Sequence, residues 1–143
     1  MNKRAILWLP AGVLAAACGL QFAYGAEPGL PPLQHAGAIS YLSGGVGSDQ
    51  SGAIKSVMHR YPLVLEFVGK TGADNEYLAD VPVHIADAHG NNLLTTKANG
   101  PFMLLSLPHG RYVVSANYNG KTERREVDIE AATRAHEMFV WQM

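Results

Sequence analysis

Short apolar runs separated by turn-forming residues dominate the chain from about residue 63 onward. In residues 63–68 and 81–85, large apolar side chains occupy every second position, the period of a strand with one buried face. Glycine, proline and asparagine interrupt these runs at intervals of roughly ten residues. About seven strands spaced in this way predict a mainly β protein, a seven-stranded antiparallel sandwich.

Residues 101–118, PFMLLSLPHGRYVVSANY, hold two apolar runs around a tight turn. Pro108 fixes φ and Gly110 tolerates a positive φ, so we expect the two runs to pair as a central hairpin. Asn119-Gly120 is a strong signal for a type I′ turn and predicts a second hairpin. Pro82 lacks an N–H, so the strand that contains it is expected to be an edge strand or to begin near that residue.

The N-terminus has the features of a secretory signal peptide. Lys3 and Arg4 precede an apolar stretch over residues 5–20, and small residues allow cleavage after Gly25. The stretch is too short and too interrupted for a membrane span. We therefore expect a signal peptide over residues 1–25 and a periplasmic protein, with no transmembrane segment in the mature chain.

Cys18 is the single cysteine, and cleavage after Gly25 would leave the mature chain without disulfides or thiol chemistry. Lipidation of Cys18 is the alternative. Removing Lys3 and Arg4 takes the basic count from 11 to 9 while the acidic count stays at 12, a net charge of −3 with histidine neutral. A mildly acidic chain of this kind is a poor candidate for binding nucleic acid or anionic membrane.

Residues 26–38 contain three prolines and two glycines without periodicity, which predicts a flexible lead-in before a domain over residues 39–143. A short helix is expected over about residues 49–60, with Ser48 or Asp49 as N-cap. Its apolar stripe consists of Ile54, Val57, Met58 and Tyr61.

Gly44, Gly45 and Gly47 lie just before this helix. Glycine-rich backbone at a helix N-terminus can bind an anion through free N–H groups. No Lys-Ser/Thr pair follows, and the dinucleotide spacing is missing. A tight strand-to-helix turn that needs positive φ is the interpretation we favour, with a backbone anion loop as the alternative.

Several turn and strand motifs together carry a family resemblance. They are residues 77–85 (YLADVPVHI), His89-Gly90, residues 107–112 (LPHGRY) and residues 118–120 (YNG). These resemble the carboxypeptidase regulatory-like domain, a prealbumin-like (transthyretin-like) seven-stranded sandwich. The resemblance implies a fold and no peptidase activity, because in metallocarboxypeptidases this module is an appendage and the zinc lies in another domain.

More narrowly, the chain resembles small secreted proteobacterial proteins that contain this domain. The matching parts are Tyr41-x-Ser-Gly-Gly-x-Gly before the helix and Phe139-x-Trp141 in the closing strand. A transthyretin-like hydrolase that acts on 5-hydroxyisourate ends in Tyr-Arg-Gly-Ser, whereas this chain ends in Val-Trp-Gln-Met. The resemblance therefore does not extend to that chemistry.

One basic cluster could form an interaction surface. It comprises Arg111, Lys121, Arg124 and Arg125 with Tyr118 beside them. On adjacent strands these residues could bind a carboxylate-bearing partner, although pairing with neighbouring acidic residues is the simpler interpretation.

No catalytic, cofactor or metal site can be assembled from residue spacing. The mature chain has no nucleophile elbow and no paired histidine motif, and its histidines, such as His84 and His136, are expected to be solvated. We expect a non-catalytic periplasmic binding module without a cofactor, whose partner is an unidentified periplasmic or envelope protein. The alternative is a metal-handling protein that uses exposed histidine and methionine.

Overall fold

The computed structural model describes residues 29–131 and 133–143. The predicted signal peptide and Cys18 lie outside the described residues. The described part holds one α-helix, one 3-10 helix and ten strands in two sheets, which confirms a mainly β fold with one helix. The elements are β1 (Gln34–Ala36), β2 (Ile39–Gly44), α1 (Ser48–Val57), η2 (Met58–Arg60), β3 (Leu63–Thr71), β4 (Asp74–Tyr77), β5 (Val81–Asp87), β6 (Asn92–Ala98), β7 (Phe102–Ser106), β8 (Gly110–Tyr118), β9 (Lys121–Ile129) and β10 (Ala135–Gln142).

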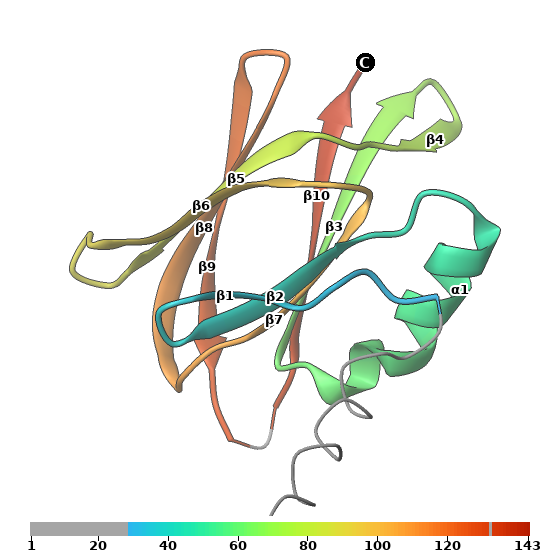
Figure 1. Cartoon of the computed structure of the whole chain (residues 1–143). Helices are drawn as coiled ribbons and strands as arrows, with labels where there is room; N and C mark the ends of the chain where they lie inside the picture. Colours follow the sequence, from blue (N-terminus) through green and yellow to red (C-terminus); the bar gives the residue numbers. More distant parts are fainter. Residues whose placement is uncertain (1–28, 132) are drawn as a thin grey trace, which may run out of the picture.

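The two sheets enclose a common core. The first, sheet A, has the strand order β1-β2-β7-β3-β10 with β4 added to β3, and the second, sheet B, has the order β6-β5-β8-β9 (Figure 1). The residues with the expected two-residue period do face inward. The core includes Leu63, Leu65, Phe67, Val81, Val83, Ile85, Val114, Ala116, Phe139 and Trp141.

The expected central hairpin over residues 101–118 is wrong. β7 pairs with β2 and β3 in sheet A, whereas β8 pairs with β5 and β9 in sheet B. The turn around Pro108 therefore carries the chain from one sheet to the other. Local sequence does not distinguish such a crossing from a hairpin, because the same turn residues suit both.

The sandwich is not wholly antiparallel. β10 lies parallel to β3, with Ala135 opposite Leu63 and Gln142 opposite Lys70. The polar segment after β3 also contains a strand, β4, which pairs antiparallel with the end of β3. The alternation of apolar and polar residues within a strand predicted which of its faces is buried. It did not predict which strands pair with each other.

The hairpin predicted at Asn119-Gly120 is present, and the structure contains a second one between β5 and β6. β8 and β9 are joined at Asn119 and Gly120, whose φ values of 51° and 80° suit a type I′ turn. β5 and β6 are joined through Gly90, with φ 88°. β5 is an interior strand, but its pairing with β8 starts only at Val83, so Pro82 lies near the beginning of the strand as the second alternative predicted.

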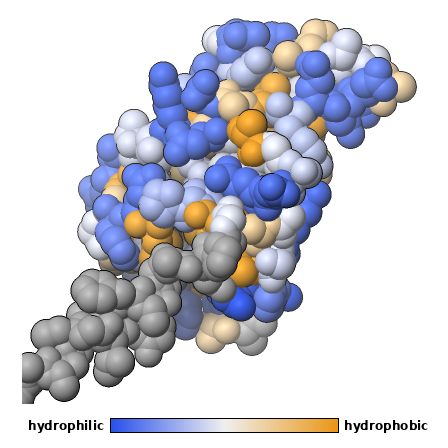
Figure 2. All heavy atoms as spheres, turned by 45° about the vertical axis from the view of Figure 1, so that its right-hand side comes forward, coloured by the Kyte–Doolittle hydropathy of each residue, from blue (hydrophilic) through white to orange (hydrophobic). Residues whose placement is uncertain are grey.

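Helix α1 covers part of the outer face of sheet A. Ile54 and Val57 are buried against Leu42, Val64 and Leu104. The N-cap is Gly47 and not Ser48 or Asp49, and no side chain caps the helix. On the same side of the molecule, apolar residues occur as separate patches among polar ones (Figure 2).

Within the predicted lead-in, β1 pairs with β2. In the part of the chain that the structure describes, no helix has both the length and the apolar character needed to cross a bilayer.

Candidate functional site

The four basic residues of the predicted interaction surface do not form one cluster. Successive side chains of β9 point to opposite faces, so Arg124 and Arg125 are separated by the sheet. Arg111 lies opposite Asp128 and Arg124 opposite Ser115, all on the outer face of sheet B. The side chains of Lys121 and Arg125 lie on the inner face of sheet B, which faces sheet A.

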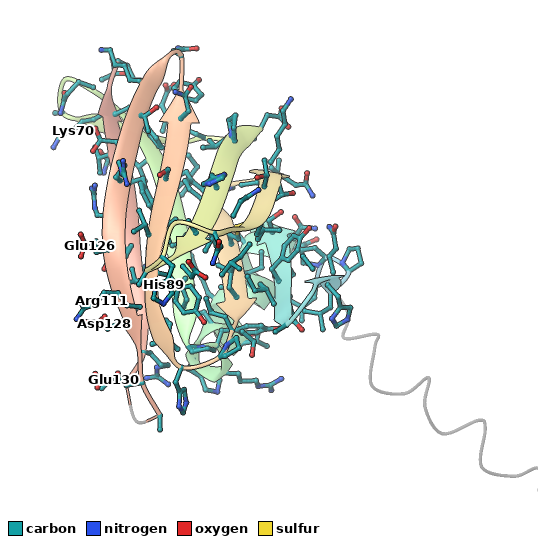
Figure 3. All side chains as sticks on the ribbon, turned by 90° about the vertical axis from the view of Figure 1, so that its left-hand side faces the viewer. Lys70, His89, Arg111, Glu126, Asp128 and Glu130 are labelled. Carbon is teal, nitrogen blue, oxygen red and sulfur yellow. The ribbon has the colours of Figure 1, made fainter. Side chains whose placement is uncertain are left out.

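The positive charge of Arg111 is balanced by neighbouring carboxylates. Its Nε donates a 2.9 Å hydrogen bond to Asp128 Oδ1. The Asp128 carboxylate, and secondly the charge of Glu126, raise the pKa of Arg111 above its ordinary value. These residues follow one another along the β8–β9 pair with Glu130 beyond them (Figure 3). Arg111 therefore agrees with the simpler interpretation, in which the basic residues pair with neighbouring acidic residues.

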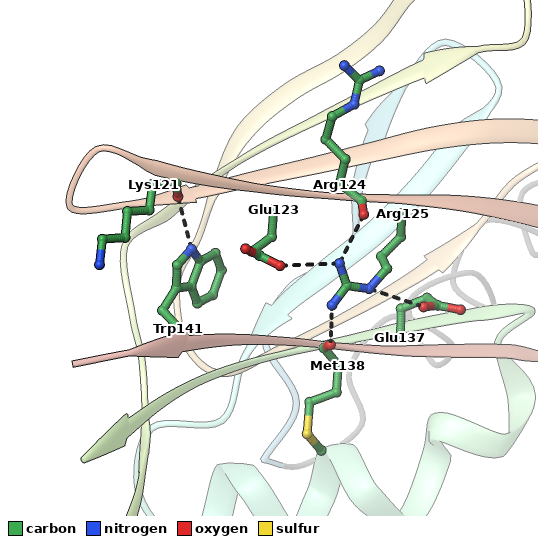
Figure 4. A network of polar contacts seen from close by, with 7 residues as sticks. All are labelled: Lys121, Glu123, Arg124, Arg125, Glu137, Met138 and Trp141. Atoms are coloured by element: carbon green, nitrogen blue, oxygen red, sulfur yellow. Dashed lines mark hydrogen bonds and ion pairs between the residues drawn. The ribbon is translucent and has the colours of Figure 1, made fainter. Parts of the chain in front are cut away.

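Arg125 bridges the two sheets. Its Nη1 donates to the Arg124 carbonyl at 2.9 Å and its Nη2 to the Met138 carbonyl at 3.3 Å (Figure 4). Nε lies 3.8 Å from Glu137 Oε1, and the guanidinium carbon is 5.1 Å from the centre of the Phe139 ring. We refer to this contact between β9 and β10 as the seam.

Trp141 extends the seam toward the β8–β9 turn. Its Nε1 donates a 2.9 Å hydrogen bond to the Lys121 carbonyl (Figure 4). Its ring centre lies 5.9 Å from that of Tyr118. Tyr118 therefore packs against the edge of the core. Side chains thus bind backbone carbonyls of both strands on this side of the sandwich.

The opposite side of sheet B ends at β6. Within residues 29–131 and 133–143, β6 pairs with β5 and with no strand on its other side. The Ala98 carbonyl accepts a hydrogen bond of 2.8 Å from the Asp80 N–H, on the β5 side. Because backbone groups of successive residues alternate in direction, those of Lys97 point toward the free edge. Pro82 lies opposite Lys97 and lacks an N–H, which agrees with this direction.

The β5–β6 hairpin projects from the body of the sandwich and has a rigid tip (Figure 1). Asp87 Oδ1 accepts hydrogen bonds from the N–H groups of His89 and Asn91 at 2.9 and 3.0 Å, and Oδ2 accepts one from Asn91 Nδ2 at 3.0 Å. The side chain of Asn91, followed by its backbone N–H, lowers the pKa of Asp87 below its ordinary value. These bonds fix the turn from which β6 begins.

The glycine segment has a structural role that accounts for its sequence. Gly45 has φ 104°, and a Cβ there would lie 2.6 Å from the Phe102 ring. The Gly45 N–H donates to Gln50 Oε1 at 2.8 Å, so helix α1 uses that donor internally. Ser43 is buried and accepts a 3.0 Å hydrogen bond from the Asn99 N–H. Of the proposed anion loop, Gly44 ends β2, and Gly47, with φ 89°, begins the helix.

The histidines are dispersed, and His136, although exposed as expected, has a carboxylate partner. His136 forms a close hydrogen bond with Glu66, whose side chain is only 12% exposed. Glu66 lies on the outer face of sheet A, and burial on that face explains why its carboxylate needs a partner. His84 lies on the outer face of the other sheet, so the two histidines do not approach each other. Among the described residues, no three His, Cys, Asp or Glu side chains are grouped closely enough to hold a metal ion.

Comparison with known proteins gives little further information. No family model matches the chain, and no curated protein matches its sequence. Among solved structures, the chain is similar to the Bacillus anthracis TIE protein, with 19% identity and a TM-score of 0.39 over 57% of this chain. It spans 16% of the length of that protein. A likeness at this level establishes neither a shared fold nor a shared activity.

Proposed function

We propose that the protein is a non-catalytic binding module that adds an extended segment of a partner protein to the free edge of β6. The observation that carries the proposal is the projecting β5–β6 hairpin, whose outer strand pairs with no other strand among the described residues. In this mode of recognition, backbone hydrogen bonds supply affinity and side chains supply specificity. The predicted signal peptide places the partner among periplasmic or envelope proteins.

The difference between the two sides of the sandwich supports β6 as the binding edge. At the seam, Met138 and Lys121 already use their carbonyl groups for Arg125 and Trp141. β6 has seven residues, whereas β1, the edge of sheet A on the other side, has three. A segment added to β6 could therefore form several backbone hydrogen bonds before it reached the end of the strand.

Two side chains on β6 suggest the chemistry of the partner segment. The pairing shifts between Ile85 and Ala86, so Leu93 has no direct partner on β5 and is 37% exposed. Lys97 is exposed on the outer face. An apolar residue beside Leu93 and an acidic one beside Lys97 would suit this edge.

The resemblance to carboxypeptidase regulatory-like domains supports the same function. In enzymes with such a domain, the module accompanies the catalytic domain without performing chemistry. A stand-alone domain of this type would therefore act through its surface and its strand edges.

The proposal is tested by affinity capture from periplasmic extract with the purified protein and two variants. Lys97→Pro removes an N–H that points to the free edge and leaves the bonds to β5 intact, whereas Lys97→Ala removes only the side chain. We expect a stoichiometric partner for the wild type and for Lys97→Ala, and none for Lys97→Pro.

The same samples are examined by mass spectrometry for copper and zinc. Equal capture by all three proteins would exclude β6 as the binding edge. About one equivalent of metal without a protein partner would favour the metal-handling alternative.

A further inference from the structure

Three connections meet at one end of the sandwich and surround a cavity of about 650 Å³. They are the segment between α1 and β3, the crossing from β7 to β8, and residues 130–131 and 133–134 between β9 and β10. None of the residues that line the cavity belongs to β6. The cavity is lined by His59, Arg60, Pro62, Ser106, Leu107, His109, Ile129, Glu130, Ala131, Thr133 and Arg134.

The lining is basic in a protein that is slightly acidic as a whole. The lining includes two arginines, Arg60 and Arg134, two histidines, His59 and His109, and one carboxylate residue, Glu130. The complete chain has 11 basic and 12 acidic residues. A concave site with charges mainly of one sign concentrates ligands of the opposite sign.

The cavity contains an arginine held by a hydrogen bond and, beneath it, apolar residues that are buried. Arg134 Nη1 donates a 2.6 Å hydrogen bond to the His59 carbonyl, which ties the β9–β10 connection to the end of η2. This bond uses one of five guanidinium N–H groups and holds the planar head in place. Leu107 and Ile129 in the same lining are buried, so the polar lining residues lie next to the packed core.

We propose that this cavity binds a small oxyanion with two or more negative charges, a phosphate or a polycarboxylate. Arginine presents parallel N–H donors whose spacing matches the oxygens of both groups. Imidazole N–H groups add donors and, when protonated, further positive charge. The Ser106 and Thr133 hydroxyls supply neutral donors within the same lining.

The ligand site is independent of the proposed binding edge. The cavity is formed by connections at the sheet end, whereas the β6 edge is formed by backbone groups of a single strand. Variants in the cavity are therefore expected to leave partner capture unchanged. Failure of one proposal does not affect the other.

The experiment is a titration of the purified protein with citrate and with inorganic phosphate, followed by calorimetry and by ¹H–¹⁵N NMR, with sodium chloride at matched ionic strength as reference. The variants are Arg134→Gln, Arg134→Lys and His109→Gln. Arg124→Gln is the matched control, since Arg124 is exposed on the outer face of sheet B, outside the cavity. Thermal unfolding of each variant verifies that it is folded.

We expect saturable binding of at least one of the two anions, with amide shifts confined to the three connections. Loss of one charge-assisted hydrogen bond weakens affinity by about tenfold or more. Arg134→Gln should show this loss, His109→Gln a smaller one, Arg134→Lys an intermediate one, and Arg124→Gln none.

Three outcomes would overturn the proposal. One is the absence of a response to either anion at about 10 mM, a concentration that would detect even a millimolar Kd. Another is equal weakening by Arg124→Gln and Arg134→Gln. The third is binding to vesicles that contain phosphatidic acid without any response to the free anions, which would assign the site to a lipid headgroup.

Discussion

The hydroxyl of Tyr112 donates a 2.6 Å hydrogen bond to the carbonyl of Pro108, four residues earlier in the chain. Tyr112 is the third residue of β8 and is buried, while Pro108 lies in the crossing between the two sheets. Burial, and secondly the charge of Asp87, raise the pKa of Tyr112 above its ordinary value. The bond fixes the path by which the chain leaves sheet A and enters sheet B, as a tyrosine corner does in other sandwiches.

Tyr112→Phe removes this bond and keeps the ring. We expect the free energy of unfolding to fall by about 1 kcal/mol, because the partly buried hydrogen bond to the Pro108 carbonyl is lost. Urea unfolding measures the change. Tyr118→Phe is the matched control, since Tyr118 contributes ring packing against Trp141, and it should change stability less. Equal effects of the two variants would contradict the role of the bond.

Removal of Asp87 should produce a pH-dependent loss of stability. The pKa of Asp87 in the folded protein is lowered from 3.8, so its contribution is present above that ordinary value and is lost as pH falls through the depressed folded value. The wild type should therefore be more stable than Asp87→Ala at neutral pH, and the difference should shrink in acid. Urea midpoints measured from about pH 7 to about pH 2 test this. A difference that is independent of pH would contradict it.

Arg125 and Arg124 offer a direct comparison on one strand. Arg125→Ala removes the hydrogen bond to the Met138 carbonyl and the contact with the Phe139 ring. We expect a loss of about 1 kcal/mol and faster amide exchange in β10. Arg124→Ala, on the exposed face, should leave both quantities nearly unchanged. Similar exchange rates in the two variants would show that the seam does not depend on Arg125.

Two glycines should respond in opposite directions to alanine. Gly45 has φ 104°, and its new Cβ would meet the Phe102 ring at 2.6 Å, so Gly45→Ala should destabilise the fold by about 1 kcal/mol or more. Gly52 lies in helix α1 with nothing within 4 Å of an added Cβ. Gly52→Ala should therefore stabilise by about 0.5 to 1 kcal/mol. Thermal unfolding of the two variants decides both signs, and a loss of stability in Gly52→Ala would contradict the open environment of that position.

Local patterns in the sequence predicted local structure well. The helix over about residues 49–60 corresponds to α1 and η2, because Ile54 and Val57 must both reach one apolar surface. Asn119-Gly120 predicted its hairpin because few residue pairs tolerate two positive φ values. Alternation predicted the buried faces of β5 and β8.

Strand partners could not be predicted in the same way. The pattern in residues 101–118 is equally compatible with a hairpin and with a sheet crossing, and only the tertiary structure separates them. The free edge of β6 was also not predicted. Pro82 was a signal for it, because its missing N–H marks the pairing in which the backbone of Lys97 points outward. The basic cavity combines residues from three connections, and no spacing in the sequence brings His59 near Arg134.

The parallel pairing of β10 with β3 has a consequence for the order of folding. Glu66 and His136 are separated by 70 positions in the sequence, and their strands can pair only after all the intervening elements have been made. Contacts of such long range slow folding. Phe139 and Trp141 lie on β10 and complete the core. We therefore expect the partly synthesised chain to stay unfolded until these two residues have been made. If the predicted signal peptide directs export, late pairing of β10 would keep the chain unfolded while it passes through a narrow export channel.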